Sequence, residues 1–262
     1  MLGREVVRAA AEHEAVALTH AELDVTDRSA VESAVAEARP DVVINCAAFT
    51  DVDGAESHEE AATLLNGEAA GYLATAAPAI VHPSTDYVFD GTKRTPYVES
   101  DRTDPRSAYG RSKLTGEQAV SAANPRHFVV RTSWLFGVGG RNFVDTMLGL
   151  NRDEVRVVDD QVGCPTYAGH LANALVELAA SGAYGVHHVA GSGECSWFEF
   201  ASEIFRLADL DVRVVPCTTA EFPRPAPRPA YSVLGSERPD PIRLPDWREG
   251  LAAYLAERAP AR

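Results

Sequence analysis

Short apolar runs alternate with helix-like stretches along most of the chain, and this alternation constrains the fold more than any other feature. The apolar runs, which predict β-strands, are 15–19, 42–46, 79–82, 128–132 and 155–158. The stretches that predict helices are 29–38, 58–76, 107–122 and 142–150. Strands that are apolar almost throughout suit a parallel sheet covered by helices on both faces. We therefore expect an α/β fold with a doubly wound, Rossmann-like parallel sheet.

Side-chain oxygens near the predicted helix starts indicate where two of the helices begin. Asp27 or Ser29 is expected to cap the helix 29–38, and Ser57 the helix 58–76, because such an oxygen accepts a free backbone N–H. In a sheet of this kind, ligands bind at the carboxyl ends of the strands.

The character of the sequence changes after about residue 160. Glycine and proline interrupt shorter elements there, and 216–245 is rich in Pro and Arg with little periodicity. We expect a smaller lobe that closes over the crevice at the strand ends. The predicted division is a dinucleotide-binding domain at 1–163 and a substrate-binding lobe at 164–262, with an approximate boundary and interleaved segments.

Charge and cysteine content exclude several classes of function. Acidic residues outnumber basic ones 38 to 24, and a net charge of −14 argues against nucleic acid and membrane surfaces as partners. The four cysteines are widely spaced with no Cys-x-x-Cys, which indicates reduced thiols and no zinc site. His187-His188 has no carboxylate or thiol at ligand spacing, so we expect no metal.

The same composition predicts a cytoplasmic protein. No apolar run has the length of a membrane span, and the first residues lack the apolar core of a signal peptide. A homodimer is one arrangement that the sequence allows.

The chemistry-bearing residues are concentrated in two segments. Tyr109 and Lys113 are four residues apart in a predicted helix, so their side chains share one face. An ammonium beside a phenol favours the phenolate and prepares the hydroxyl as a proton donor. Thr85, after the strand 79–82, offers a hydroxyl that could hold a substrate oxygen. This pattern indicates a carbonyl-reduction site; the alternative is a surface tyrosine beside a solvated lysine.

The front of the chain departs from a usual dinucleotide-binding fold. Such a fold begins with a strand and a glycine-rich turn whose backbone N–H groups receive the pyrophosphate. Met1-Leu2-Gly3 resembles only the last glycine of that turn, running into the first helix. Two explanations stay open: a natural start roughly ten residues upstream, which we favour, or the loss of the usual phosphate cradle.

Seven motifs together identify a known family. They are LDVTD at 23–27, AAFTDVD at 47–53, STDYVFDG at 84–91, YGRSK at 109–113, RTSWLFG at 131–137, VDDQ at 158–161 with PT at 165–166, and RPAYS at 228–232. With these motifs the chain resembles the dTDP-4-dehydrorhamnose reductase family, which are extended short-chain dehydrogenases/reductases. The resemblance covers nearly the whole chain apart from the front, where the first strand and most of the glycine-rich turn are missing or truncated.

The resemblance implies roles for five residues. Tyr109 would protonate the C4 ketone oxygen while the nicotinamide delivers a hydride to C4, and Thr85 would hydrogen-bond the reacting oxygen. Lys113 would hold the ribose and lower the pKa of Tyr109. Asp86 and Trp134 fall where this family contacts the sugar nucleotide.

The resemblance also implies a cofactor site. Its residues would be Leu2, Gly3, Asp24, Val25, Ala48, Phe49, Thr50, Tyr109 and Lys113. The family leans to NADPH. NADH is the alternative, because Thr19-His20 gives neither an acidic residue for NAD nor an arginine for the NADP phosphate.

The implied activity is NADPH-dependent reduction of a dTDP-4-dehydro-6-deoxysugar, with dTDP-4-dehydro-L-rhamnose reduced to dTDP-L-rhamnose. Two alternatives stay open. One is a 4-ketoreductase for another nucleotide-linked deoxysugar in secondary metabolism. The other is a catalytically silent relative that binds a partner protein or a nucleotide, motivated by the missing glycine turn.

Overall fold

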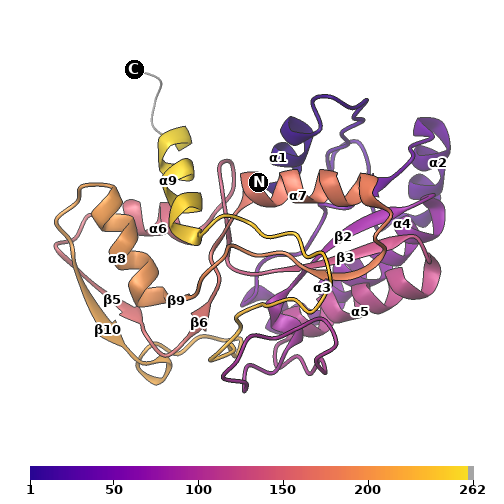
Figure 1. Cartoon of the computed structure of the whole chain (residues 1–262). Helices are drawn as coiled ribbons and strands as arrows, with labels where there is room; N and C mark the ends of the chain where they lie inside the picture. Colours follow the sequence, from indigo (N-terminus) through magenta and orange to yellow (C-terminus); the bar gives the residue numbers. More distant parts are fainter. Residues whose placement is uncertain (259–262) are drawn as a thin grey trace.

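Four parallel strands form the main sheet in the computed structural model, which describes residues 1–258 (Figure 1). Their order is β1-β2-β3-β8, and all three pairings are parallel. The strands are β1 Val43–Ile44, β2 Ile80–Thr85, β3 His127–Thr132 and β8 Gly185–His188. The register pairs Ser84 with Arg131 and Thr85 with Thr132, so β2 and β3 end level with each other. The fold class predicted from the alternation of apolar runs is confirmed.

Helices cover both faces of this sheet. Helices α1 Leu2–Ala9 and α7 Ala168–Ser181 pack on one face, and α2 Arg28–Ala38, α4 Ala69–Ala76 and α5 Ala108–Ala123 pack on the other (Figure 1). Side chains alternate between the two faces along each strand. Val81 and Phe128 therefore join the core under α7, whereas Ile80 and Val129 join the core under α4 and α5.

One of the two helix caps predicted from the sequence is observed. The Asp27 carboxylate accepts the backbone N–H groups of Ser29 and Ala30 and caps α2, as predicted. The expected cap at Ser57 is wrong, because the residue at the start of the next helix is His58, which makes no side-chain cap bond. The Ser57 hydroxyl donates instead to the Gly54 carbonyl, at 3.2 Å.

The helical stretch 58–76 consists of three parts. They are α3 Glu59–Thr63, the π-helical turn η2 Leu64–Glu68 and α4. It is preceded by the 3-10 turn η1 Gly54–Glu56.

The expected strand at 15–19 is not observed. No part of 15–19 is extended strand, and Val16 is 63% exposed to solvent. A strand is stabilised by the ladder of hydrogen bonds to a neighbour. Within residues 1–258, β1 forms the edge of the main sheet on this side, and no further strand pairs with it or with 15–19.

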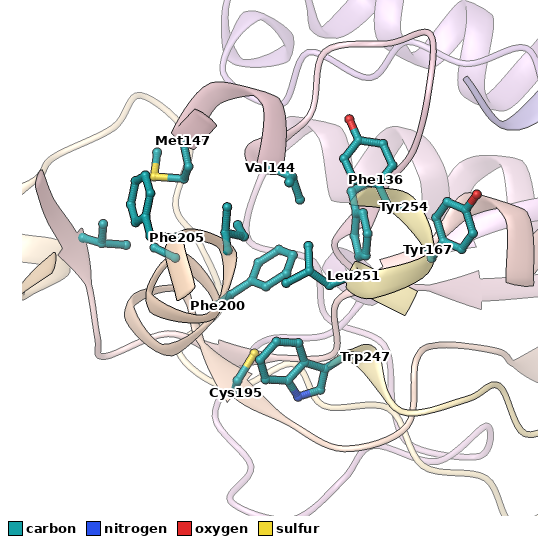
Figure 2. Close-up of a cluster of buried hydrophobic side chains, with 13 residues drawn as sticks. Phe136, Val144, Met147, Tyr167, Cys195, Phe200, Phe205, Trp247, Leu251 and Tyr254 are labelled. Atoms are coloured by element: carbon teal, nitrogen blue, oxygen red, sulfur yellow. The ribbon is translucent and has the colours of Figure 1, made fainter. Parts of the chain in front are cut away.

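A smaller lobe holds most of the C-terminal third. Strand β5 Glu154–Val158, predicted as a strand, pairs in parallel with β10 Arg213–Cys217 outside the main sheet. The other elements of this part of the chain are β4 Leu135–Phe136, β6 Val162–Gly163, β7 Thr166–Tyr167, β9 Cys195–Ser196, α6 Phe143–Leu148, α8 Trp197–Leu207, α9 Trp247–Arg258 and η4 Thr219–Glu221. The 3-10 turn η3 Asp86–Val88 directly follows β2 of the main sheet. Figure 2 shows the lobe core, in which Phe136, Phe200, Trp247, Leu251 and Tyr254 pack together.

Two broader properties bear on function. Among residues 1–258, no helix combines the length and apolar character needed to cross a membrane. The same residues contain no cluster of three or more His, Cys, Asp or Glu side chains suited to a metal ion.

Candidate active site

The carboxyl ends of β2 and β3 and the first two turns of α5 meet at one place. Thr85 is the last residue of β2, and Asp86 begins the turn η3 that follows it. Helix α5 begins at Ala108, where the Ser107 hydroxyl accepts the Gly110 N–H at 3.1 Å. This cap fixes the first turn, which carries Tyr109.

Tyr109 lies against Thr85. The nearby Thr85 hydroxyl lowers the pKa of the Tyr109 phenol, but burial and the Asp86 charge outweigh this and raise the pKa of Tyr109 to about 12. The Tyr87 ring meets the Tyr109 ring edge to face, with centroids 5.6 Å apart. A phenol that keeps its proton at neutral pH in a dry site can act as a proton donor.

Lys113 is buried one helical turn beyond Tyr109. Its Nζ donates a hydrogen bond of 2.7 Å to the Pro83 carbonyl, two residues before Thr85. Burial lowers the pKa of Lys113 to about 8, although the Glu117 and Cys46 charges act in the opposite direction. The net rise in the pKa of Tyr109 comes from burial and the Asp86 charge, and the influence of Lys113 on this phenol stays a prediction.

Three buried polar atoms at this site have no hydrogen-bond partner among residues 1–258. They are Asp86 Oδ2, Thr132 Oγ1 and Ser232 Oγ. The other Asp86 oxygen accepts the Thr85 hydroxyl at 3.0 Å. Burial raises the pKa of Asp86 to about 6, against the influence of neighbouring Ser232 and Thr85. Buried polar groups normally have partners, so these atoms are suited to a polar ligand.

Ser232 was not among the predicted site residues. It reaches the site from the C-terminal part of the chain, where its backbone N–H donates to the Val162 carbonyl. The signal that could have found it is its position as the last residue of the RPAYS motif.

The segment after β1 is fastened to α5 by Asn66. The Asn66 side chain accepts the Phe49 N–H at 2.8 Å and donates to the Phe49 carbonyl at 3.0 Å and to the Ser112 hydroxyl at 2.9 Å. The Phe49 ring packs with Tyr109 around the same small core. Phe49 therefore lies beside the predicted proton donor, and Ala48 and Thr50 are its neighbours in the chain. No sequence pattern indicated Asn66, which lies in the π-helical turn.

Of the other predicted cofactor residues, Leu2 and Gly3 lie in the first turn of α1, and Asp24 and Val25 lie in the segment before α2. A methyl group added to Gly3 would lie 3.4 Å from Cys46 Cβ, so the first turn of α1, with Leu2 and Gly3, abuts the segment after β1. Asp24 is exposed and accepts the Thr26 N–H and hydroxyl, at 2.9 and 2.7 Å. Val25 packs at the edge of the core under α2 and α4.

Trp134 follows β3 by two residues and has an unusual backbone. Its φ is 46°, in the left-handed region that bulky residues rarely adopt. Its indole stacks on that of Trp197, with centroids 3.5 Å apart and planes 6° apart. A methyl group added to Gly163 would lie 2.5 Å from the Trp134 ring, so the Gly163 backbone also approaches this indole closely. Trp197 was not predicted.

Comparison with known proteins identifies close relatives. A family model described as "RmlD substrate binding domain" matches residues 1–259. The chain is 50% identical to a "Probable dTDP-4,6-dihydroxy-2-methyloxan-3-one 4-ketoreductase" of Streptomyces antibioticus, over 96% of this chain and 90% of the relative. It is 46% identical to a dTDP-4-dehydrorhamnose reductase of Mycolicibacterium smegmatis, over 98% and 82%. The crystal structure of dTDP-4-dehydrorhamnose reductase from Bacillus anthracis in complex with NADP is similar at a TM-score of 0.94 and 39% identity, over 98% of this chain and 95% of that one.

Proposed function

The chain belongs to the dTDP-4-dehydrorhamnose reductase family, and from this premise we propose that it reduces the C4 ketone of a dTDP-4-dehydro-6-deoxysugar with NADPH. It is an oxidoreductase of the short-chain dehydrogenase/reductase type. The substrate that we propose first is dTDP-4-dehydro-L-rhamnose, with dTDP-L-rhamnose as product.

One observation carries the proposal: the Tyr109 phenol lies against the Thr85 hydroxyl, with the buried Lys113 ammonium one turn further along α5. A ketone oxygen bound between the two hydroxyl groups receives the Tyr109 proton. The high pKa of Tyr109 keeps that proton available at neutral pH. Lys113 supplies a positive charge that offsets the phenolate left behind.

The residues present fit a dinucleotide. At the start of α1 the Arg4 N–H donates to the Met1 carbonyl at 3.2 Å, whereas the N–H groups of Leu2 and Gly3 precede the first intrahelical bond. They lie beside the segment after β1, where a phosphate would be favoured. Ala48, Phe49 and Thr50 would support the ribose and pyrophosphate, Asp24 and Val25 the adenine, and Tyr109 and Lys113 the nicotinamide ribose. When bound, NADPH supplies the hydride.

The sugar side of the proposed site contains Asp86, Thr132 and Ser232. Their unpartnered oxygens support binding of a hydroxyl-bearing sugar. Trp134, held by Trp197, offers a flat apolar ring of the kind that packs against a deoxysugar. We propose that 1–163 forms most of the cofactor domain and 164–262 most of the substrate lobe. The two interleave, because β4, α6 and β5 lie in the lobe and α7 and β8 return to the main sheet.

A second substrate is favoured by one observation. The relative from Streptomyces antibioticus is 50% identical to this chain and is named as the ketoreductase of a different dTDP-sugar. We therefore propose, as the second candidate, the 4-ketoreduction of another dTDP-linked deoxysugar in secondary metabolism.

The test is turnover of a panel of dTDP-4-ketosugars, followed by NADPH fluorescence and mass spectrometry of the products. The rhamnose precursor should be the best substrate, and a strong preference for another sugar would favour the second candidate. Tyr109→Phe should reduce kcat by about 10³-fold without changing Tm, because it removes the donated proton. The matched control is Tyr72→Phe on α4, whose hydroxyl only donates to Glu68. A near-normal rate for Tyr109→Phe would overturn the proposal.

A further inference from the structure

A buried ion pair lies directly behind the proposed active site. The Arg131 guanidinium donates to both carboxylate oxygens of Glu117, at 2.7, 3.0 and 3.3 Å. Both side chains are about as buried as the core, at 5% and 6% exposure. Replacing a buried pair of this kind by apolar side chains is often neutral or stabilising. Stability alone therefore does not explain its presence.

The pair joins α5 to the ends of β2 and β3. Glu117 also accepts the Ser84 hydroxyl at 2.5 Å. Ser84 immediately precedes Thr85 on β2, and Arg131 immediately precedes Thr132 on β3. Thr85 and Thr132 are paired across the sheet. The Glu117 carboxylate thus bonds the residue that precedes each of these two threonines, Ser84 on β2 and Arg131 on β3.

Arg131 itself is held from three further directions. Its Nη1 donates to the Glu99 carbonyl at 3.3 Å and lies 3.3 Å from His188 Nε2. Its guanidinium lies 5.1 Å from the centre of the Phe89 ring. The pKa of His188 is lowered by burial and by Arg131, so this imidazole stays neutral. The position of the Glu117 charge is therefore fixed.

Lys113 is one helical turn from this carboxylate. Residues 109, 113 and 117 lie on one face of α5. The titratable groups that face Lys113 are Cys46 after β1, His82 on β2, and Tyr109 and Glu117 on α5. Burial and Lys113 hold the pKa of His82 well below 6.5, and burial raises the pKa of Cys46 to about 11. Both are neutral at pH 7, so the negative charge that faces Lys113 is the Glu117 carboxylate of the ion pair with Arg131.

We propose that Glu117, clamped by Arg131 and Ser84, is a positioning residue that keeps the buried Lys113 side chain charged and aligned for the reaction. This inference rests on the proposed function for its catalytic meaning, but the charge of Lys113 is measurable without substrate or cofactor.

The proposal predicts shifts of opposite sign for the two members of the pair. Glu117→Gln removes the negative charge and leaves Arg131 unbalanced, so the pH midpoint of Lys113 should fall by about one pH unit. Arg131→Gln leaves Glu117 unbalanced, so the midpoint should rise. A merely structural pair would give two unstable proteins with unchanged midpoints.

Lysine-selective ¹³C labelling at Cε measures this directly, because the chain contains only Lys93 and Lys113. Lys93→Arg assigns the two resonances, and the pH titration of each gives its midpoint. Val120→Ala is the matched control: it removes buried volume from the same helix but no charge, so it should lower Tm and leave the midpoint unchanged. Activity of the wild-type chain on the sugar panel tests the proposed function separately.

Opposite shifts for Glu117→Gln and Arg131→Gln, with Val120→Ala unmoved, support the proposal. Shifts of the same sign, or shifts below about 0.3 pH unit in both variants, overturn it. If one variant fails to fold, the sign of the other decides. If both fail to fold, Glu117→Asp decides. Its shorter side chain moves the carboxylate away from Lys113, so the pH midpoint of Lys113 should fall by less than in Glu117→Gln. An unchanged midpoint would contradict the proposal.

Discussion

Gly110 leaves no room for a side chain beside the proposed proton donor, and Gly110→Ala is therefore a sharp perturbation. A methyl group at this position would lie 2.3 Å from the Tyr87 carbonyl oxygen and 2.9 Å from Pro105 Cβ. An ordinary carbon–oxygen contact is about 3.5 Å, so either Tyr87 or the start of α5 must move by about 1 Å.

Either movement would displace one of the proposed reacting groups, Tyr109 or Thr85. Tyr109 immediately precedes Gly110, and the Tyr87 N–H donates to the Thr85 hydroxyl at 3.2 Å. A misplacement of about 1 Å can reduce turnover by roughly 10²-fold. Overpacking costs about 1–3 kcal/mol, and the better helix propensity of alanine returns about 1 kcal/mol of this. The net loss of about 0–2 kcal/mol corresponds to a fall in Tm of at most roughly 8 °C.

The assay is kcat with NADPH and the preferred dTDP-ketosugar, together with thermal unfolding followed by circular dichroism. The matched control is Gly71→Ala on α4, where the added methyl meets only Ala119 Cβ at 3.2 Å. It should leave kcat unchanged and shift Tm by less than about 3 °C. A Gly110→Ala enzyme that keeps at least a third of the wild-type kcat would refute the geometry argued here.

Three further predictions follow from individual contacts. Asn66→Ala removes three hydrogen bonds and leaves the partly buried backbone of Phe49 without these partners, so the free energy of unfolding should fall by ~1–2 kcal/mol; unchanged denaturant midpoints would count against this. The pKa of Lys113 lies near 8, lowered from 10.5 by burial, so its ammonium is complete below pH 7 and is lost as pH rises through 8. The reduction rate should fall over that interval, and a flat profile from pH 7 to pH 9 would contradict the role of Lys113. Trp197→Leu removes the stacking partner of Trp134, worth about 1 kcal/mol, and should raise KM for the sugar nucleotide more than it lowers kcat; an unchanged KM would argue against the proposed sugar contact.

Local sequence patterns predicted most of the elements of the sheet domain. The apolar runs that became β2 and β3 are buried on both faces, and burial on both faces is what makes such a run apolar throughout. Asp27 was predicted as a cap because its carboxylate reaches backbone N–H groups only two and three residues away. The run 15–19 has the same apolar character, but a strand also needs a neighbour, and that depends on the whole sheet.

The sequence by itself determined the α/β class, the family and the candidate set Thr85, Tyr109 and Lys113, because these signals lie in short contiguous motifs whose spacing is set by one helix or one strand end. Only the tertiary structure decided which distant residues meet them. Ser232 beside Asp86, Asn66 on the Phe49 backbone, and Arg131 against Glu117 are all contacts between segments far apart in the chain. Such contacts follow from strand register and helix packing, which no local pattern encodes, and they set the burial that fixes the charge of each group in the site.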